Sequence, residues 1–166
     1  MKNKITIAIT GHRDLIINPK LTHQISELFD KLINEYETLT LLSALAIGAD
    51  QLVAKIFLEK QKKHKNLHLL VPIPFSLERY KEDFTNNELT KFSAVLNAAD
   101  NYFKVPQLCE NAYESLGIYL VNETNILLAL WNGTFNHKKG GTGDVVAYAK
   151  QERKELIHFL CQRKNT

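Results

Sequence analysis

Residues 126–131 read Ile-Leu-Leu-Ala-Leu-Trp, residues 140–144 read Gly-Gly-Thr-Gly-Asp, and residues 145–149 read Val-Val-Ala-Tyr-Ala. The first segment predicts a buried strand, because it is apolar on both faces. The glycines predict a turn, and the last segment predicts a helix. A buried strand that enters a glycine-rich turn and then a helix is typical of an anion site, since glycine lets backbone N–H groups approach a phosphate closely. The alternative is that the glycines only make a tight loop.

The alternation of strand and helix continues on both sides of this stretch. Short apolar or β-branched segments predict further strands at residues 5–9, 39–45, 67–71, 101–105 and 156–160. Apolar residues at helical spacing, together with capping signals, predict helices at residues 19–36, 48–65, 76–80, 85–98 and 112–120. Because no linker or repeat interrupts the alternation, we expect one domain over residues 1–166, with an α/β three-layer Rossmann-like fold around a mostly parallel sheet.

The composition is that of a folded globular protein, and its mild positive charge permits an acidic ligand. The chain has 166 residues, 45% of them hydrophobic and 23% charged, and its formal net charge of +3 does not indicate the concentrated basic face that duplex nucleic acid requires. Cys109 and Cys161 are too few and too far apart for a disulfide framework or a zinc site. No apolar signal region opens the chain and no apolar stretch approaches the roughly 20 residues of a membrane span, so we expect a cytoplasmic protein without a membrane partner.

Polar and glycine residues gather where the predicted strands end, whereas the strands themselves are nearly all apolar. In an open parallel sheet, ligands bind outside the carboxyl ends of the strands, where the strand order reverses. We therefore predict a binding cleft at this edge of the sheet. The candidate ligand-binding residues are Gly11, His12, Arg13, Ser43, Gly48, Asp50, Phe75, Trp131, Lys139, Gly140, Gly141, Thr142, Gly143 and Asp144.

The polar candidates have a functional and a structural interpretation each. Arg13 is suited to pair with a phosphate, and His12 to hydrogen-bond the phosphate or a ribose hydroxyl, unless both are solvated loop residues. Asp50 is suited to bind ribose hydroxyls or to support the first turn of its own helix, whose N-terminus Gly48 would bring to the cleft. Thr142 would cap a helix, bind a phosphate, or do both.

The aromatic and lysine candidates are open to the same two interpretations. Phe75, Tyr80 or Trp131 would stack on a base, although aromatic residues at strand ends more often belong to the core. Lys138 and Lys139 would close over a phosphate, or would simply keep the loop soluble.

Other chemistries are less well supported by the sequence. The histidines show no metal-ligand spacing with carboxylates or cysteines, so neither a metal nor another cofactor is expected. Ser43 lacks the glycine-flanked elbow of a hydrolase nucleophile, and the chain after Gly11 lacks the further glycines of a dinucleotide-binding dehydrogenase. Glu78, Glu82 and Asp83 look like an exposed helix face.

Four segments at the strand exits carry a family resemblance. They are residues 9–13 (Ile-Thr-Gly-His-Arg), 42–50 (Leu-Ser-Ala-Leu-Ala-Ile-Gly-Ala-Asp), 72–84 (opening with Pro-Ile-Pro-Phe) and 131–144 (ending in Gly-Gly-Thr-Gly-Asp). In this order they resemble the SLOG superfamily, a Rossmann-like group that includes LOG-type phosphoribohydrolases, DprA-like proteins and ligand-sensing domains of TRPM channels and bacterial defence proteins. The resemblance covers nearly the whole chain. It implies binding of a nucleotide derivative, often one related to ADP-ribose, in signalling or defence.

The resemblance to the LOG-type enzymes is partial. Their pattern is Pro-Gly-Gly-any-Gly-Thr, then two residues, then a catalytic Glu. The glycines of residues 140–143 match, but Lys139 replaces the proline, Asp144 replaces the threonine, and Ala147 stands where the glutamate belongs. The phosphate-binding half of the pattern is therefore present without its catalytic half, which favours binding over catalysis.

We therefore expect a module that senses or sequesters a phosphate-bearing nucleotide derivative, with Arg13 and the glycine loop at its phosphates and Asp50 and Asp144 at ribose hydroxyls. The main alternative is a nucleotide N-glycosidase or phosphoribohydrolase that uses Asp144 or Asp50 as its acidic group. A third interpretation, binding of single-stranded nucleic acid, expects a basic groove with stacking aromatics, whereas this chain shows only scattered lysines. Members of the superfamily often dimerise, so the resemblance also implies a homodimer.

Overall fold

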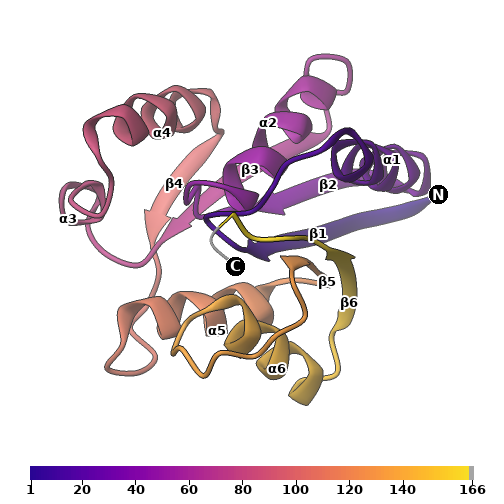
Figure 1. Ribbon diagram of the computed structural model, residues 1–166. Coiled ribbons are helices and arrows are strands. Elements are labelled where there is room, and N and C mark those ends of the chain that lie inside the picture. Colours follow the sequence, from indigo (N-terminus) through magenta and orange to yellow (C-terminus); the bar gives the residue numbers. More distant parts are fainter. Residues whose placement is uncertain (165–166) are drawn as a thin grey trace.

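Within residues 1–164, which the computed structural model describes, six parallel strands form one sheet in the order β4-β3-β2-β1-β5-β6 (Figure 1). The strands are β1 (Lys2–Gly11), β2 (Tyr36–Leu42), β3 (Leu67–Ile73), β4 (Asn101–Lys104), β5 (Ile126–Trp131) and β6 (Glu155–Leu160). The helices are α1 (Pro19–Glu35), α2 (Ala49–Gln61), α3 (Leu77–Lys81), α4 (Asn86–Ala98), α5 (Ala112–Glu123) and α6 (Thr142–Gln151). The predicted α/β three-layer Rossmann-like fold is confirmed.

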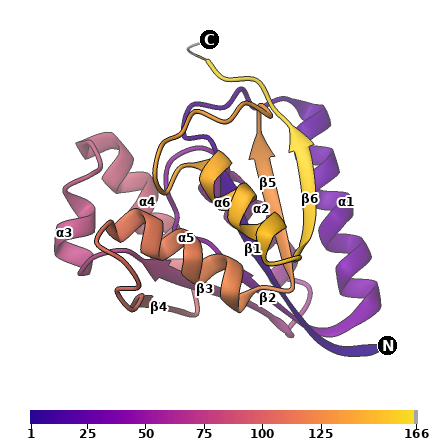
Figure 2. The same ribbon diagram turned by 90° about the horizontal axis from the view of Figure 1, so that it is seen from below.

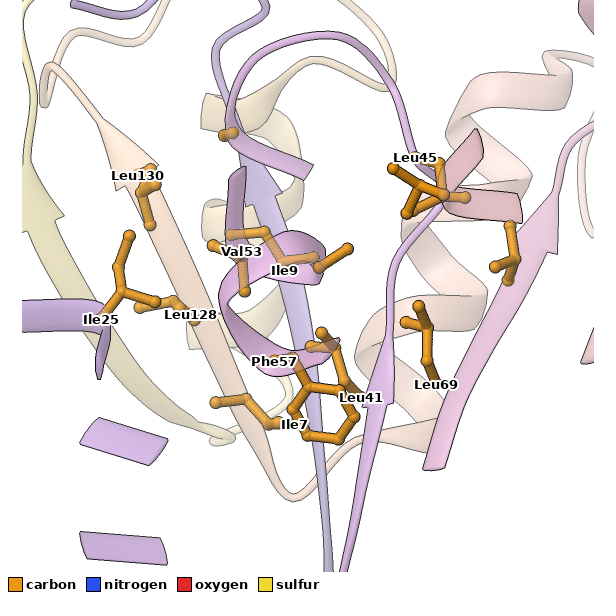
Figure 3. Packing of buried hydrophobic residues seen from close by; sticks show 14 of the residues in the cluster. Ile7, Ile9, Ile25, Leu41, Leu45, Val53, Phe57, Leu69, Leu128 and Leu130 are labelled. Atoms are coloured by element: carbon orange, nitrogen blue, oxygen red, sulfur yellow. The ribbon is translucent and has the colours of Figure 1, made fainter. Parts of the chain in front are cut away.

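Helices cover both faces of the sheet, α1, α2 and α4 on one face and α5 and α6 on the other (Figures 1 and 2). Alternation along β1 sends its side chains to both layers. Ile7 and Ile9 pack under α2 beside Phe57 (Figure 3), whereas Ala8 belongs to a second buried cluster with Leu120 and Val145 of α5 and α6. The two clusters are the reason that β5 and residues 7–9 of β1 are apolar on both faces.

Two helices begin at the capping signals that the sequence contains. The side chain of Asn18 accepts the N–H of Leu21 at 2.9 Å, with Pro19 as the first residue of α1. Thr85 and Glu88 form a reciprocal capping box at the start of α4. Each cap satisfies N–H groups that have no partner within the helix, and both predictions are confirmed.

The boundaries of β2 and α6, both next to the predicted cleft, differ from the predicted ones. Strand β2 begins at Tyr36, because it pairs with β1 from its first residue, and it ends before residues 43–45, which form a loop. In that loop Leu45 has a φ of 58° and is fully buried. Helix α6 begins at Thr142, so the glycine turn passes directly into its first turn. In residues 1–164 no helix is long and apolar enough to cross a membrane.

The strand order reverses beside β1. From β1 the chain builds outward through β2, β3 and β4, and α5 then returns it to β5 on the other side of β1. Because all the strands are parallel, their carboxyl ends share one edge of the sheet. The crevice at that edge, beside β1 and β5, is where ligands bind in open α/β sheets.

Candidate functional site

A cleft of about 590 Å³ opens at the carboxyl ends of β1 and β5. Its volume is in the usual range for small-molecule sites, and its lining comes from segments far apart in the sequence. The predicted candidates that line it are Gly11, His12, Arg13, Asp50, Trp131, Lys138, Lys139, Gly140, Gly141, Thr142 and Gly143. The strand exits named from the sequence therefore meet around one cavity.

Four predicted candidates lie outside the lining and support it instead: Ser43, Gly48, Phe75 and Asp144. The hydroxyl of Ser43 donates to the backbone carbonyl of Asp50 at 3.1 Å and accepts the N–H of Leu45 at 3.3 Å. Gly48 precedes α2, whose first N–H donates to the carbonyl of His12 at 3.1 Å. The N-terminus of α2 is thus tied to the β1 loop, which is a structural role.

Gly11 is required for the close approach of α2 to the end of β1. A Cβ atom at this position would lie 2.4 Å from the Cβ of Ala49 and 2.7 Å from the carbonyl oxygen of Leu130. Any larger residue would push α2 away from the sheet and change the shape of the cleft floor.

The glycine turn is held by hydrogen bonds of its own. Oδ2 of Asp144 accepts the N–H of Gly140 at 2.9 Å, and the N–H of Gly141 donates to the carbonyl of Lys138 at 3.0 Å. Gly140 has a φ of 74°, and a Cβ there would lie 2.7 Å from the backbone of Tyr113 at the start of α5. Asp144 therefore fixes the turn against α5.

The first turn of α6 presents unpartnered N–H groups to the cleft. Gly141 is the N-cap and has no side chain to accept them, and within residues 1–164 the amides of Thr142, Gly143 and Asp144 have no hydrogen-bond partner. Thr142 and Gly143 line the cleft. A helix N-terminus in this state carries a partial positive charge and attracts an anion.

His12 joins the loops that follow β1 and β5. Its imidazole is 8% exposed, and Nε2 accepts the backbone N–H of Asn132 at 3.1 Å. Burial lowers the pKa of His12 below its ordinary value, which favours the neutral ring that this bond requires. Since Nε2 is occupied by the protein, the histidine shapes the site and has only its other nitrogen for a ligand.

Asp50 is a buried acid on the cleft wall. It is 9% exposed, and Oδ2 accepts the N–H of Ala46 at 3.3 Å. Burial raises the pKa of Asp50 to about 7, against the opposing effects of the Ala46 hydrogen bond and the positive charge of Arg13. This carboxyl group therefore titrates near neutral pH.

Three cations of the cleft have no acidic partner. Arg13 is exposed, and its guanidinium lies 5.8 Å from the ring centroid of Tyr113. Within residues 1–164, no carboxylate lies in ion-pair distance of Arg13, Lys138 or Lys139. Their charge is available to a ligand.

Two further arginines line the cleft in ion pairs. Nη1 of Arg79 lies 2.9 Å from Oδ1 of Asp83, and its guanidinium lies 4.4 Å from the ring centroid of Phe75. Nε of Arg163 lies 2.8 Å from Oδ1 of Asp14. Asp83 is only 26% exposed, so it is part of the cleft wall and not of the exposed helix face that the sequence indicated.

The aromatic candidates differ in what they offer a base. Tyr80 also lines the cleft, but it is fully buried and its hydroxyl donates to the carbonyl of Ala44 at 2.9 Å, so it is part of the core beneath the cleft. Phe75 is packed edge to face against Tyr113 outside the lining. Trp131 does line the cleft, with its Nε1 donating to the carbonyl of Thr134 at 3.2 Å. Its ring is held in place for contact with a ligand.

Sequence reasoning missed several lining residues: Thr10, Arg79, Asp83, Asn111, Tyr113 and Arg163. The sequence does contain a signal for Asn111, because the segment between the fourth predicted strand and the helix at residues 112–120 also follows a carboxyl end of the sheet. Tyr113 lies in the helix predicted at residues 112–120, where its spacing is that of an apolar helix face. In residues 1–164, no three His, Cys, Asp or Glu side chains gather as metal ligands would.

Comparison of the sequence with protein-family models and with curated proteins gave no match.

Proposed function

We propose that the protein binds a phosphate-bearing nucleotide derivative in the cleft at the carboxyl ends of β1 and β5. The observation that carries the proposal is the excess of available positive charge there. Arg13, Lys138 and Lys139 have no acidic partner within the described chain, and the first turn of α6 adds free N–H groups. Such an arrangement is stabilised by phosphate oxygens, which accept several charge-assisted hydrogen bonds at once.

The acids of the cleft do not cancel this charge. Asp83 already accepts hydrogen bonds from Arg79 and Tyr113, and the pKa of about 7 leaves Asp50 partly protonated at neutral pH. In its protonated form the carboxyl group of Asp50 is suited to hydrogen-bond a ribose hydroxyl without repelling the phosphates. The cleft is therefore complementary to a ligand with a negative charge at one end and hydroxyl groups near it.

The remaining lining suits a base or another flat apolar group. Leu116, Leu120 and Val145 are buried side chains on one wall, and Trp131 lies on the β5 side. Apolar walls with a few convergent polar groups are typical of small-molecule sites. The resemblance of these loops to the SLOG superfamily points in the same direction, and more narrowly to a derivative related to ADP-ribose in signalling or defence.

Binding without turnover, as in sensing or sequestration, is the form of this function that we favour. Ala147 stands where the LOG-type enzymes have their glutamate, and it is exposed on the outer side of α6. Asp144, the carboxylate three residues before Ala147, accepts the N–H of Gly140 and does not line the cleft. Helix α6 therefore offers the bound ligand no free carboxylate.

The second candidate function is that of a nucleotide N-glycosidase, and the carboxyl group of Asp50 on the cleft wall favours it. A carboxyl group with a pKa of about 7 on the wall of a ligand-sized cleft matches the requirement of a general acid or base at neutral pH. Of the two acids that the sequence offered for this role, Asp50 is the one that reaches the cleft.

Calorimetric titration with AMP, ADP, ATP and ADP-ribose, followed by chromatography for free base, separates these functions. We expect at least one of the four to bind and to be recovered intact. Release of base that Asp50→Asn abolishes would establish the enzyme instead. A folded protein that binds none of the four, and from which denaturation releases no nucleotide detectable by mass spectrometry, would contradict both.

A further inference from the structure

Thr10 carries a buried hydroxyl group for which residues 1–164 provide no hydrogen-bond partner. It lies near the end of β1, lines the cleft and is 9% exposed. Within residues 1–164 its Oγ1 makes no hydrogen bond, although no side-chain nitrogen or oxygen there is both fully buried and unpaired. The hydroxyl of Thr10 must therefore be open to the cleft.

The position of Thr10 on the strand directs its side chain toward the α5–α6 layer. Side chains alternate along β1, so Thr10 shares a face with Ala8, which belongs to the buried cluster containing Val145 of α6. Thr10 is two residues, about 6.6 Å, further toward the carboxyl end of the strand. The first residue of α6, Thr142, lies three residues before Val145 and therefore about 4.5 Å from it along the helix axis. This displacement also runs toward the carboxyl ends of the strands. The hydroxyl and the free N–H groups of the first turn of α6 are therefore at the same level of the cleft.

The buried cluster on the face that Thr10 shares with Ala8 is apolar, which makes a hydroxyl there unfavourable unless it is used. The partner of Thr10 across the ladder is Ala129 of β5, and Leu116, Gly117 and Val145 line the adjoining wall. Valine has nearly the same shape as threonine, a higher tolerance for apolar surroundings and an equal preference for strands. The polar residue at this position is thus not explained by the packing of the sheet.

We propose that the hydroxyl of Thr10 donates a hydrogen bond to a phosphate oxygen of the bound ligand, beside the N–H groups of Thr142 and Gly143. This inference rests on the proposed function and adds a specificity-determining residue to it. The positive end of α6 sets the chemistry, because it places an anionic oxygen where the hydroxyl can reach it.

The test compares Thr10→Val with Thr10→Ser in calorimetric titrations, using ADP-ribose and inorganic pyrophosphate as probes and adenosine as the phosphate-free control. We expect Thr10→Val to weaken both affinities tenfold to hundredfold, the value of a hydrogen bond to a charged group. Thr10→Ser keeps the hydroxyl and is expected to stay within about threefold of the parent protein. Thr10→Ala, with the same expected loss, replaces Thr10→Val should that variant fail to fold.

Thr6 supplies a matched control. It lies on the same strand and the same face as Thr10, four residues nearer the amino end, and it does not line the cleft. Thr6→Val is expected to leave both affinities unchanged. The melting temperature of Thr10→Val is expected to equal or exceed that of the parent, because no hydrogen bond within the protein is lost.

Three results would overturn the inference. If the parent protein binds ADP-ribose and Thr10→Val binds it equally well, Thr10 is not a ligand contact, and the proposed function is unaffected. If Thr10→Val weakens the binding of adenosine as much as that of ADP-ribose, the contact is to the nucleoside and not to the phosphate. If the parent protein binds none of these probes, the proposed function fails and the inference fails with it.

Discussion

The hydroxyl of Tyr113 donates a hydrogen bond to Oδ2 of Asp83, which joins the start of α5 to the segment between α3 and α4. Asp83 also accepts from Arg79 at 2.9 Å, and the guanidinium of Arg13 lies 5.8 Å from the Tyr113 ring centroid. Burial acts to raise the pKa of Asp83, but its hydrogen bonds to Tyr113 and Arg79 outweigh this effect and hold the pKa below its ordinary value. One wall of the cleft is thus a continuous polar network.

Tyr113→Phe keeps the aromatic ring and removes the hydroxyl that donates to Asp83. We expect the free energy of unfolding to fall by about 1–2 kcal/mol, because a half-exposed bond to a charged acceptor contributes less than a buried one. Urea unfolding of the variant measures this loss. Tyr102→Phe, at an exposed tyrosine on β4, is the control and is expected to be neutral. Equal stability of Tyr113→Phe and the parent protein would show that the Asp83 bond does not stabilise the wall.

Arg13→Ala is expected to weaken binding of ADP-ribose by about 1.5–3 kcal/mol, the contribution of a hydrogen bond between charged groups. The loss has this size because Arg13 has no acidic partner within the described chain and its charge is free for the ligand. Arg13→Lys keeps the charge without the planar fork and is expected to be intermediate. Calorimetry measures all three affinities, with Lys31→Ala on the exposed side of α1 as control. Unchanged affinity in a folded Arg13→Ala protein would remove Arg13 from the site.

The sheet and the position of the cleft could be predicted from the sequence because they depend on local patterns. Apolar runs such as residues 126–131 indicate buried parallel strands, and polar residues after several strands mark one edge once the strands are known to be parallel. The order of the strands was not predicted. It is the order that brings β5 next to β1 and so joins Gly11 to the glycine turn.

The roles of individual residues were harder to predict, because they depend on contacts between distant segments. His12 and Asn132 are 120 residues apart, and the sequence does not show that the imidazole is occupied by the protein. Tyr113 fits an apolar helix face in the sequence, while its hydroxyl reaches an acid from another helix pair. Thr10 was quoted only as part of a strand exit, because an unpaired buried hydroxyl can be recognised only in three dimensions.

Comparing Asp144→Ala with Asp144→Asn tests whether the carboxylate of Asp144 only holds the glycine turn or whether its negative charge is also needed. The alanine variant leaves the N–H of Gly140 without its acceptor, so we expect a loss of about 1 kcal/mol in stability and weaker binding of ADP-ribose as the turn loosens. The asparagine variant keeps an acceptor oxygen and is expected to resemble the parent protein in both properties. Thermal unfolding and calorimetry measure the two effects. If Asp144→Asn is as impaired as Asp144→Ala, the negative charge itself is needed, and the structural role is wrong.

The elevated pKa of Asp50 predicts a specific dependence of stability on pH. Burial raises its pKa from the ordinary value of 3.8 to about 7 in the folded protein, so between these two values the folded state binds more protons than the unfolded state. The free energy of unfolding contributed by this group is therefore highest below pH 4 and falls as the pH rises to about 7, above which it is constant. The fall is limited to about 4 kcal/mol, since each pKa unit corresponds to about 1.4 kcal/mol.

Asp50→Asn removes the titrating group and keeps an oxygen that can accept the N–H of Ala46. We therefore expect the difference in unfolding free energy between this variant and the parent protein to grow in favour of the variant from pH 5 to pH 7 and to stay level from pH 7.5 to pH 8.5. Subtracting the two curves cancels the contribution of the histidines, which titrate in both proteins.

ADP-ribose, whose diphosphate has no ionisation in this range, is expected to bind the parent protein more tightly at pH 6 than at pH 8, because ionised Asp50 repels the anion. A difference curve that is flat from pH 5 to pH 8.5 would place the pKa of Asp50 near its ordinary value and remove the basis for both effects.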